Sequence, residues 1–106
     1  MLFRSCFKKV NQAGAPSPLP ATDTTGWASE MAVDTQMVSA TCPLCKILLV
    51  EANSSNIADL AAAAQTAAKL GAKVVSNSYG TAEFNGQDYF DQFYKNPGVE
   101  IGRAHV

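Results

Sequence analysis

The segment Lys46-Ile-Leu-Leu-Val-Glu-Ala52 decides the fold, because its continuous apolar run is typical of a strand buried in a parallel sheet. Capping candidates between Asn53 and Asn56 then precede an alanine-rich helix over residues 57–70. Gly71 is a natural helix terminator, and Lys73 to Ser78 predicts a second strand. This order of strand, helix and strand indicates a parallel sheet with a right-handed crossover. The small side chains that permit close approach of the helix to a sheet are those of Ala61, Ala64, Ala67 and Ala68.

The flanking segments extend the same alternation. Cys6 to Val10 predicts a short strand or turn, and the proline-rich stretch from Gln12 to Asp23 predicts a surface loop. Trp27 to Ala40 predicts a helix, Gln87 to Lys95 predicts another, and Val99 begins a further strand. We therefore expect an α/β fold with helices flanking a parallel sheet, in which ligands bind beyond the carboxyl ends of the strands.

Composition limits the classes of function. The chain has 106 residues, of which 47% are hydrophobic and 16% charged, as in one small globular domain. Its net charge of −1 and its lack of a basic cluster predict no nucleic-acid partner and no attraction to a membrane surface. The longest apolar runs, Ile47 to Val50 and Leu60 to Ala64, are too short to span a bilayer.

Both ends of the chain match translated sequencing adapter. Met-Leu-Phe-Arg-Ser is encoded by the end of a common short-read adapter, and Ile-Gly-Arg-Ala-His-Val by its reverse complement. We interpret residues 1–5 and 101–106 as adapter-derived and exclude them from fold reasoning. The native segment is then residues 6–100, and the single histidine, His105, is not a candidate for any site.

Glu30 and Asp34 are two acids spaced four residues apart on the predicted helix. This spacing puts both carboxylates on one face about one turn apart, where like charges repel. Two acids at the edge of a core can share one proton, which makes one of them a general base. Alternatively, Asp23, Thr24 or Thr25 caps the helix and Glu30 only lies near its positive end. The side chains expected to pack this helix against a core are Trp27, Met31, Val33, Met37 and Val38.

Cys42 and Cys45 form a CxxC pair with three interpretations: a thioredoxin-like redox pair, half of a metal site, or a local disulfide. A redox pair requires a CxxC at a helix start after a strand, whereas this pair precedes a strand. A zinc site requires about four ligands, and of the remaining candidates only Cys6 is a cysteine once His105 is excluded. We therefore predict no metal site, although spacing alone leaves all three interpretations open.

Ordered motifs along the chain resemble the catalytic domain of sedolisins, the serine-carboxyl peptidases with a subtilisin-like fold. They are Cys6–Gln12, Gly26–Glu30 with Asp34, Cys42–Ile47, and Val75–Gly80 with Glu83. The resemblance covers residues 6 to 99 and implies a partial subtilisin-like parallel sheet flanked by helices. It also implies a parent enzyme that is secreted and monomeric and acts on a peptide or protein substrate.

The resemblance assigns roles to several residues. Glu30 would be the general base and later the general acid, because a serine hydroxyl becomes a nucleophile only when a base takes its proton. Asp34 would orient Glu30. Ser78, Tyr79 and Gly80 would line the substrate cleft and pair with an extended peptide, whereas the alternative is an ordinary exit from a strand. In a secreted peptidase, Cys42 and Cys45 would form a structural disulfide or a pair of buried thiols.

The family's other catalytic groups lie beyond this segment. The oxyanion aspartate and the nucleophilic serine follow the strand that Val99 opens, and the calcium site is also C-terminal, so we expect no cofactor here. We therefore expect an inactive fragment of a serine-type endopeptidase. The rival hypotheses are a CxxC redox or zinc protein and a non-catalytic α/β binding module, in which Glu30 and Asp34 are a helix cap and a surface charge.

Overall fold

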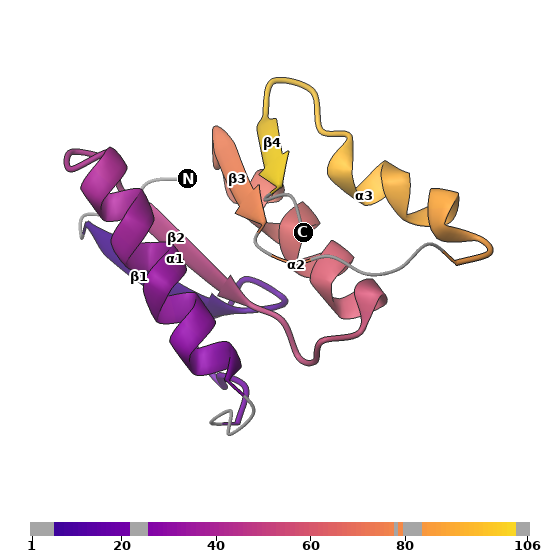
Figure 1. Cartoon of the computed structure of the whole chain (residues 1–106), viewed down its shortest axis with the longest axis horizontal. Helices are drawn as coiled ribbons and strands as arrows, with labels where there is room; N and C mark the ends of the chain where they lie inside the picture. The colour runs from indigo at the N-terminus through magenta and orange to yellow at the C-terminus, as the bar shows by residue number, and fades with distance from the viewer. Residues whose placement is uncertain (1–5, 22–25, 78, 80–83, 104–106) are drawn as a thin grey trace.

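Short strands and helices alternate along the chain in the computed structural model, which describes residues 6–21, 26–77, 79 and 84–103 (Figure 1). The elements are β1 (Phe7–Asn11), α1 (Trp27–Thr41), β2 (Ile47–Glu51), α2 (Ile57–Lys69), β3 (Val74–Asn77), η1 (Gln87–Phe90), α3 (Asp91–Tyr94) and β4 (Glu100–Arg103). No helix within these described ranges is long and apolar enough to cross a membrane. The alternation of helices with strands that pair in parallel confirms the predicted α/β class.

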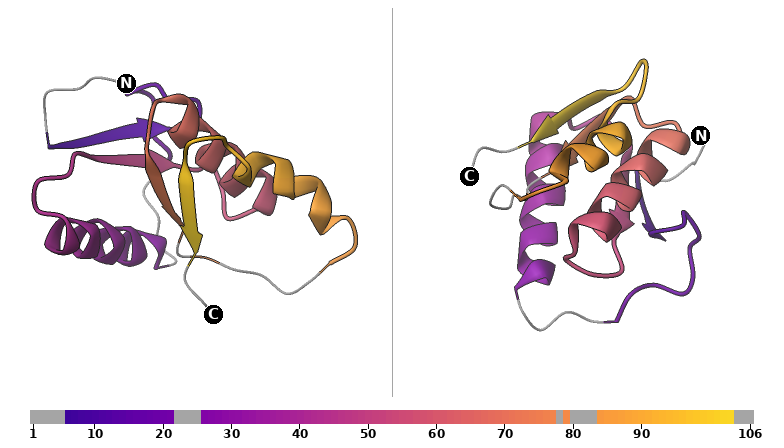
Figure 2. Two further views of the ribbon diagram at one scale, coloured as in Figure 1. Left: turned by 90° about the horizontal axis from the view of Figure 1, so that it is seen from above. Right: turned by 90° about the vertical axis from the view of Figure 1, so that its right-hand side faces the viewer.

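The strands form two separate parallel pairs in the described part of the chain, whereas the sequence predicted one sheet. In the first pair, Phe7 of β1 lies opposite Ile47 of β2, and in the second, Val74 of β3 lies opposite Glu100 of β4. Figure 2 shows in its left view that the two pairs run in different directions. Strands that cross in this way cannot share a ladder of backbone hydrogen bonds, which explains the division.

The buried core is small and centres on α2, which contacts both β2 and β3. Its buried apolar side chains are those of Val10, Ala61, Ala63, Ala64, Ala67 and Val75. The predicted small face of α2 is thus confirmed, with Ala68 half-buried beside it. The expected burial of β2 is wrong in degree, because all five of its residues are only half-buried.

Helix α1 lies along one face of the β1–β2 pair in both figures but buries none of its residues. Trp27, Met31 and Val38 are half-buried. The prediction that Val33 and Met37 pack against the core is wrong, since their side chains are 52% and 60% exposed. These two residues are one helical turn apart and share the face of α1 that is turned away from the strands.

The helix predicted over residues 87–95 forms as the single turns η1 and α3. Phe90, Phe93 and Tyr94 are half-buried, whereas Tyr89 is exposed and meets the edges of the neighbouring rings of Phe90 and Phe93. Strand β4 includes residues 101–103, which we interpret as adapter-derived. Their backbone pairs with β3, and such pairing depends on backbone groups that every residue except proline supplies in full.

Val10 tests the importance of this core. Its side chain is 1% exposed, so Val10→Ala should lower the free energy of unfolding by about 2 kcal/mol through lost burial and the cavity left behind. The matched control is Val74→Ala at a 67% exposed strand position, which should change it by about 0.5 kcal/mol or less. Urea denaturation followed by circular dichroism measures both. Equal losses in the two variants would contradict a core at Val10.

Candidate functional site

The predicted acid pair lies in the N-terminal half of α1. The helix begins after Gly26, whose φ of 103° is in the left-handed region that glycine adopts readily and which has no side chain to cap the helix. Glu30 and Asp34 therefore lie one turn apart on the same face, as predicted from their spacing. Glu30 is exposed and Asp34 is half-buried. Among the described residues, neither carboxylate has a hydrogen bond or an ion pair.

The first turn of α1 lies toward the carboxyl ends of β1 and β2, because the helix runs opposite to both strands (Figures 1 and 2). Ligands in parallel α/β sheets bind beyond those ends. Asp23, Thr24 and Thr25, the proposed alternative caps, lie outside the described residues. Glu30, in the first turn of α1, therefore lies toward the end of the strand pair at which parallel sheets bind ligands.

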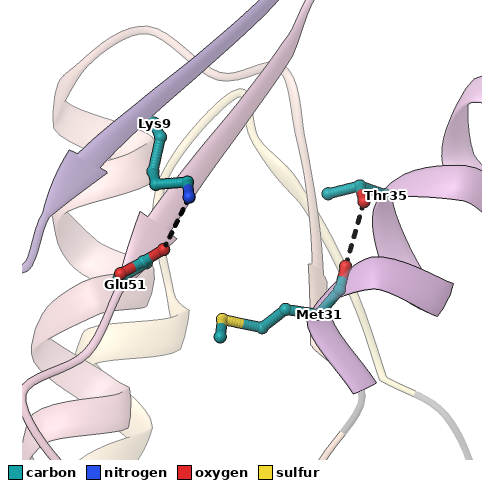
Figure 3. Close-up of polar contacts among 4 residues, drawn as sticks. All are labelled: Lys9, Met31, Thr35 and Glu51. Carbon is teal, nitrogen blue, oxygen red and sulfur yellow. Dashed lines mark hydrogen bonds and ion pairs between the residues drawn. The ribbon is translucent and has the colours of Figure 1, made fainter. Parts of the chain in front are cut away.

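A third acid, Glu51, ends β2 at the same edge of this strand pair. Its side chain is 13% exposed, and its Oε1 forms an ion pair with the Nζ of Lys9 at 3.5 Å (Figure 3). Met31 extends from α1 toward the strands, and the hydroxyl of Thr35 donates to its carbonyl at 3.0 Å. We had not predicted a role for Glu51, although a single acid at the end of the apolar run Ile47–Val50 was a visible signal. Lys9 already occupies this carboxylate, which indicates a structural role.

Tyr79 is the described member of the predicted substrate-binding segment, since Ser78 and Gly80 lie outside the described residues. Its hydroxyl donates to the Oδ1 of Asn77 at 3.0 Å and lies 2.8 Å from the hydroxyl of Tyr94. Because the Tyr79 proton goes to Asn77, Tyr94 donates its own proton to the oxygen of Tyr79. These side chains form a hydrogen-bonded chain from α3 to the end of β3.

Asn77 is a site residue that sequence reasoning missed. It is 7% exposed, and its Nδ2 donates to the carbonyl of Gly102 in β4 at 3.3 Å. Asparagine is depleted in strands, and a buried amide needs partners for its donor and its acceptor. An asparagine inside the predicted strand Lys73–Ser78 was therefore the signal that could have identified it.

A polar cluster joins the end of β1 to the first turn of α2. The Nε2 of Gln12 donates to Asp59 at 3.1 Å, and its Oε1 accepts from the backbone N–H of Asn53 at 2.8 Å. The hydrogen bond from Ser54, and then that from Gln12, lower the pKa of Asp59, while burial acts in the opposite direction. A hollow of about 290 Å³ lies beside the cluster and is lined by Asn11, Gln12, Ala13, Pro18, Asn53 and Ala62. The side chains of Gln12 and Ser54 both bind the carboxylate of Asp59, which indicates a structural role for this cluster.

The cysteines gather near the starts of β1 and β2. Cys42 and Cys45 form a disulfide that closes the turn between α1 and β2, with their Cα atoms 5.3 Å apart. Cys6 is free and exposed. Within the ranges that the structure describes, no group of three or more His, Cys, Asp or Glu residues could hold a metal ion. His105 lies outside those ranges.

The two predicted halves of the site belong to different strand pairs. Helix α1, with the acid pair, contacts β2, whereas Tyr79 follows β3 and bonds toward α3. No family model matches the chain, and comparisons with curated proteins and with solved structures likewise found no match. The residues and their geometry must therefore carry any functional assignment.

The chain of hydroxyls at Tyr79 gives a testable contribution to stability. Tyr79→Phe removes the group that bridges Asn77 and Tyr94 and leaves the buried Asn77 acceptor unpaired. The free energy of unfolding should fall by about 1–3 kcal/mol. Tyr89→Phe at an exposed ring is the matched control and should change it by about 0.5 kcal/mol or less. If chemical denaturation gives the same stability for both variants, the bridge is not formed.

Asp59 predicts a pH dependence of stability. Its pKa is lowered in the folded chain from the ordinary value of 3.8, so its contribution is present above that value. The contribution is lost as the pH falls through the folded pKa, because the unfolded chain then binds the proton first. Asp59→Asn should therefore flatten the loss of unfolding free energy below about pH 4. Asp91→Asn, at an exposed carboxylate, should lose unfolding free energy with falling pH as steeply as the unchanged chain in denaturant titrations from pH 6 to pH 2. An equally steep loss in Asp59→Asn and Asp91→Asn would contradict the assignment.

Proposed function

We propose that this chain is the N-terminal part of the catalytic domain of a serine-carboxyl peptidase with a subtilisin-like fold. Glu30 and Asp34 are its general-base pair. The observation that carries the proposal is their position on α1, one turn apart on one face, in the part of the helix that lies toward the carboxyl ends of β1 and β2. The ordered motifs from Cys6 to Val99 add the family resemblance.

The chemistry follows from the pair. A serine from the remainder of the domain attacks the peptide carbonyl while Glu30 takes the hydroxyl proton. Glu30 then returns that proton to the departing amine, and the acyl-enzyme is hydrolysed by water. Asp34 is less exposed than Glu30, so it suits the role of orienting its partner and sharing its proton. A carboxylate base of this kind favours catalysis at acid pH.

The uncovered face of α1 supports the proposal. Val33 and Met37 are exposed on the helix, and Leu44 is 98% exposed in the turn that follows it. Val33 and Met37 lie one turn apart, and contiguous exposed apolar surface of that kind marks contact sites in proteins. The remainder of a subtilisin-like domain would cover this surface. Secretion of the parent, its monomeric state and its action on peptides or proteins are parts of the same proposal.

A non-catalytic α/β binding module is the second candidate. The observation that favours it is the exposure of Glu30, whose carboxylate has no partner among the described residues. In that case Glu30 and Asp34 are surface charges without a catalytic role, and the apolar face of α1 is the binding surface. The CxxC redox or zinc alternative has no comparable support, because Cys42 and Cys45 precede a strand rather than begin a helix.

Substitution of the acid pair in the parent enzyme tests the proposal. The coding sequence is extended through the continuation of its reading frame, and hydrolysis of a quenched peptide is measured at pH 4. Glu30→Gln should lower kcat/KM at least about 100-fold, because general-base catalysis contributes roughly that much or more. Asp34→Asn should lower it in the same direction, and the 106-residue chain alone should not hydrolyse the peptide.

Asp91→Asn provides the matched control, since this exposed acid lies on α3 rather than α1. It should leave kcat/KM unchanged. Full activity in Glu30→Gln, or a continued reading frame without a serine nucleophile, would overturn the peptidase assignment. Either result would leave the binding module as the better account of the exposed acids.

A further inference from the structure

We propose that Asn85 is a site of spontaneous deamidation, in which the backbone nitrogen of Gly86 attacks the side-chain amide of Asn85. The two residues form the middle of an exposed turn that leads into η1. The backbone N–H of Gln87 donates to the carbonyl of Phe84 at 3.3 Å, and the backbone N–H of Phe84 donates to the Oε1 of Gln87 at 3.1 Å. Gly86 has a φ of 85°, which glycine adopts readily.

The two reacting groups of this turn are not engaged elsewhere. Among the described residues, the backbone N–H of Gly86 and the side-chain amide of Asn85 have no hydrogen bond that must break before they react. A Cβ built on Gly86 would meet no atom within 4 Å in that part of the chain, so this side of the turn is open. Because Gly86 has no side chain, its nitrogen reaches the amide carbon of Asn85 without the obstruction that a Cβ causes.

Three other asparagines are protected from the same reaction. The Oδ1 of Asn11 accepts two backbone hydrogen bonds, at 3.0 and 2.9 Å, and its Nδ2 donates a third at 3.0 Å, so its amide is held in place. Asn77 is buried, with 7% of its surface exposed. Asn96 precedes Pro97, which has no backbone N–H to act as the nucleophile.

The two remaining asparagines, Asn53 and Asn56, are exposed and serve as internal comparisons. They are followed by Ser54 and Ile57, whose side chains crowd the attacking nitrogen, and the branched Cβ of Ile57 does so most strongly. Asn85 is the one asparagine in the sequence that is followed by glycine. The combination of exposure and an unhindered nucleophile therefore singles out Asn85.

The reaction balances with water as the only co-reactant. The nitrogen of Gly86 bonds to the Cγ of Asn85, and the bond between Cγ and Nδ2 breaks. Nδ2 takes the electron pair of that bond and the proton of the Gly86 amide and leaves as ammonia, so that a cyclic imide remains. Water then opens the ring at either carbonyl carbon. Opening at Cγ gives aspartate, whereas opening at the backbone carbonyl carbon gives isoaspartate, in which the chain continues through the side chain.

The products change the charge and the backbone of this turn. Each product adds a carboxylate three positions before Asp88. Isoaspartate also adds a carbon to the backbone between Phe84 and Gln87, so the hydrogen bonds that these two residues exchange lose their geometry. The ring of Phe84 meets that of Phe90 with centroids 6.2 Å apart. Deamidation is therefore a slow and irreversible change that loosens Phe84 from the aromatic residues of η1.

Peptide mapping of the whole chain tests the proposal. The protein is incubated at pH 8, where a backbone amide loses its proton more readily than at acid pH, and samples taken at intervals are digested and analysed by mass spectrometry. We expect Asn85 to deamidate at least about tenfold faster than Asn53 or Asn56, because the attacking residue lacks a Cβ. Fragmentation of the product should identify both aspartate and isoaspartate at position 85.

Two variants separate the nucleophile from the exposure of the turn. Gly86→Ala should slow the loss of Asn85 at least about tenfold. Since alanine is strained at this φ, the same comparison is made in 6 M guanidinium chloride, where the turn is absent. Asn85→Gln keeps an exposed amide but requires a larger ring, and it should show no conversion over the same period.

Three results would overturn the proposal. The first is deamidation of Asn53 at the same rate as Asn85. The second is aspartate as the only product, because water would then have attacked the amide directly. The third is a rate at Asn85 in buffer more than about tenfold below that in guanidinium chloride, because the folded turn would then prevent the attack.

Discussion

The close approach of α2 to both strand pairs is the contact on which the rest of the structure depends. Ala61 is fully buried, and Ala63, Ala64 and Ala67 complete the face that the helix packs inward. Alanine permits this approach because it carries only a methyl group and loses no side-chain entropy on burial. The two strand pairs run in different directions, so a helix that touches both β2 and β3 holds them in one body.

The same helix fixes the loop that leaves β1. The hydroxyl of Thr66 donates to the carbonyl of Gln12 at 2.6 Å. The side chain of Gln12 binds Asp59, which lies about two turns before Thr66 on the same helix. Gly14 lies so close to Leu70 that a Cβ would approach its Cδ1 to 3.3 Å, and its φ of 91° also favours glycine. The carboxyl end of β1 is thereby tied to α2, and the edge near which α1 begins is held in place.

Local patterns predicted the elements well, but they did not predict how the elements share a core. Alanine content and capping residues indicated a helix over 57–70, and the structure has α2 over Ile57–Lys69. The apolar run at Ile47–Val50 indicated a strand, yet its burial depends on helices that must cover both faces. Val33 and Met37 fit a packed helix by composition, but only the direction of α1 over the strands shows that they face outward. Partners distant in sequence, such as Gln12 with Asp59, leave no periodic signal at all.

The candidate site illustrates the same division between local and distant information. Helical spacing alone brings Glu30 and Asp34 to one face, and so the structure of α1 adds little to that inference. Their chemistry depends on the surroundings, because a shared proton requires a setting in which two ionised carboxylates are disfavoured. On an exposed face, water screens the repulsion between neighbouring carboxylates. Whether another part of the protein covers α1 therefore decides between a general-base pair and two surface acids without a catalytic role. The exposed apolar side chains of Val33 and Met37 on the same helix are the reason to expect that cover.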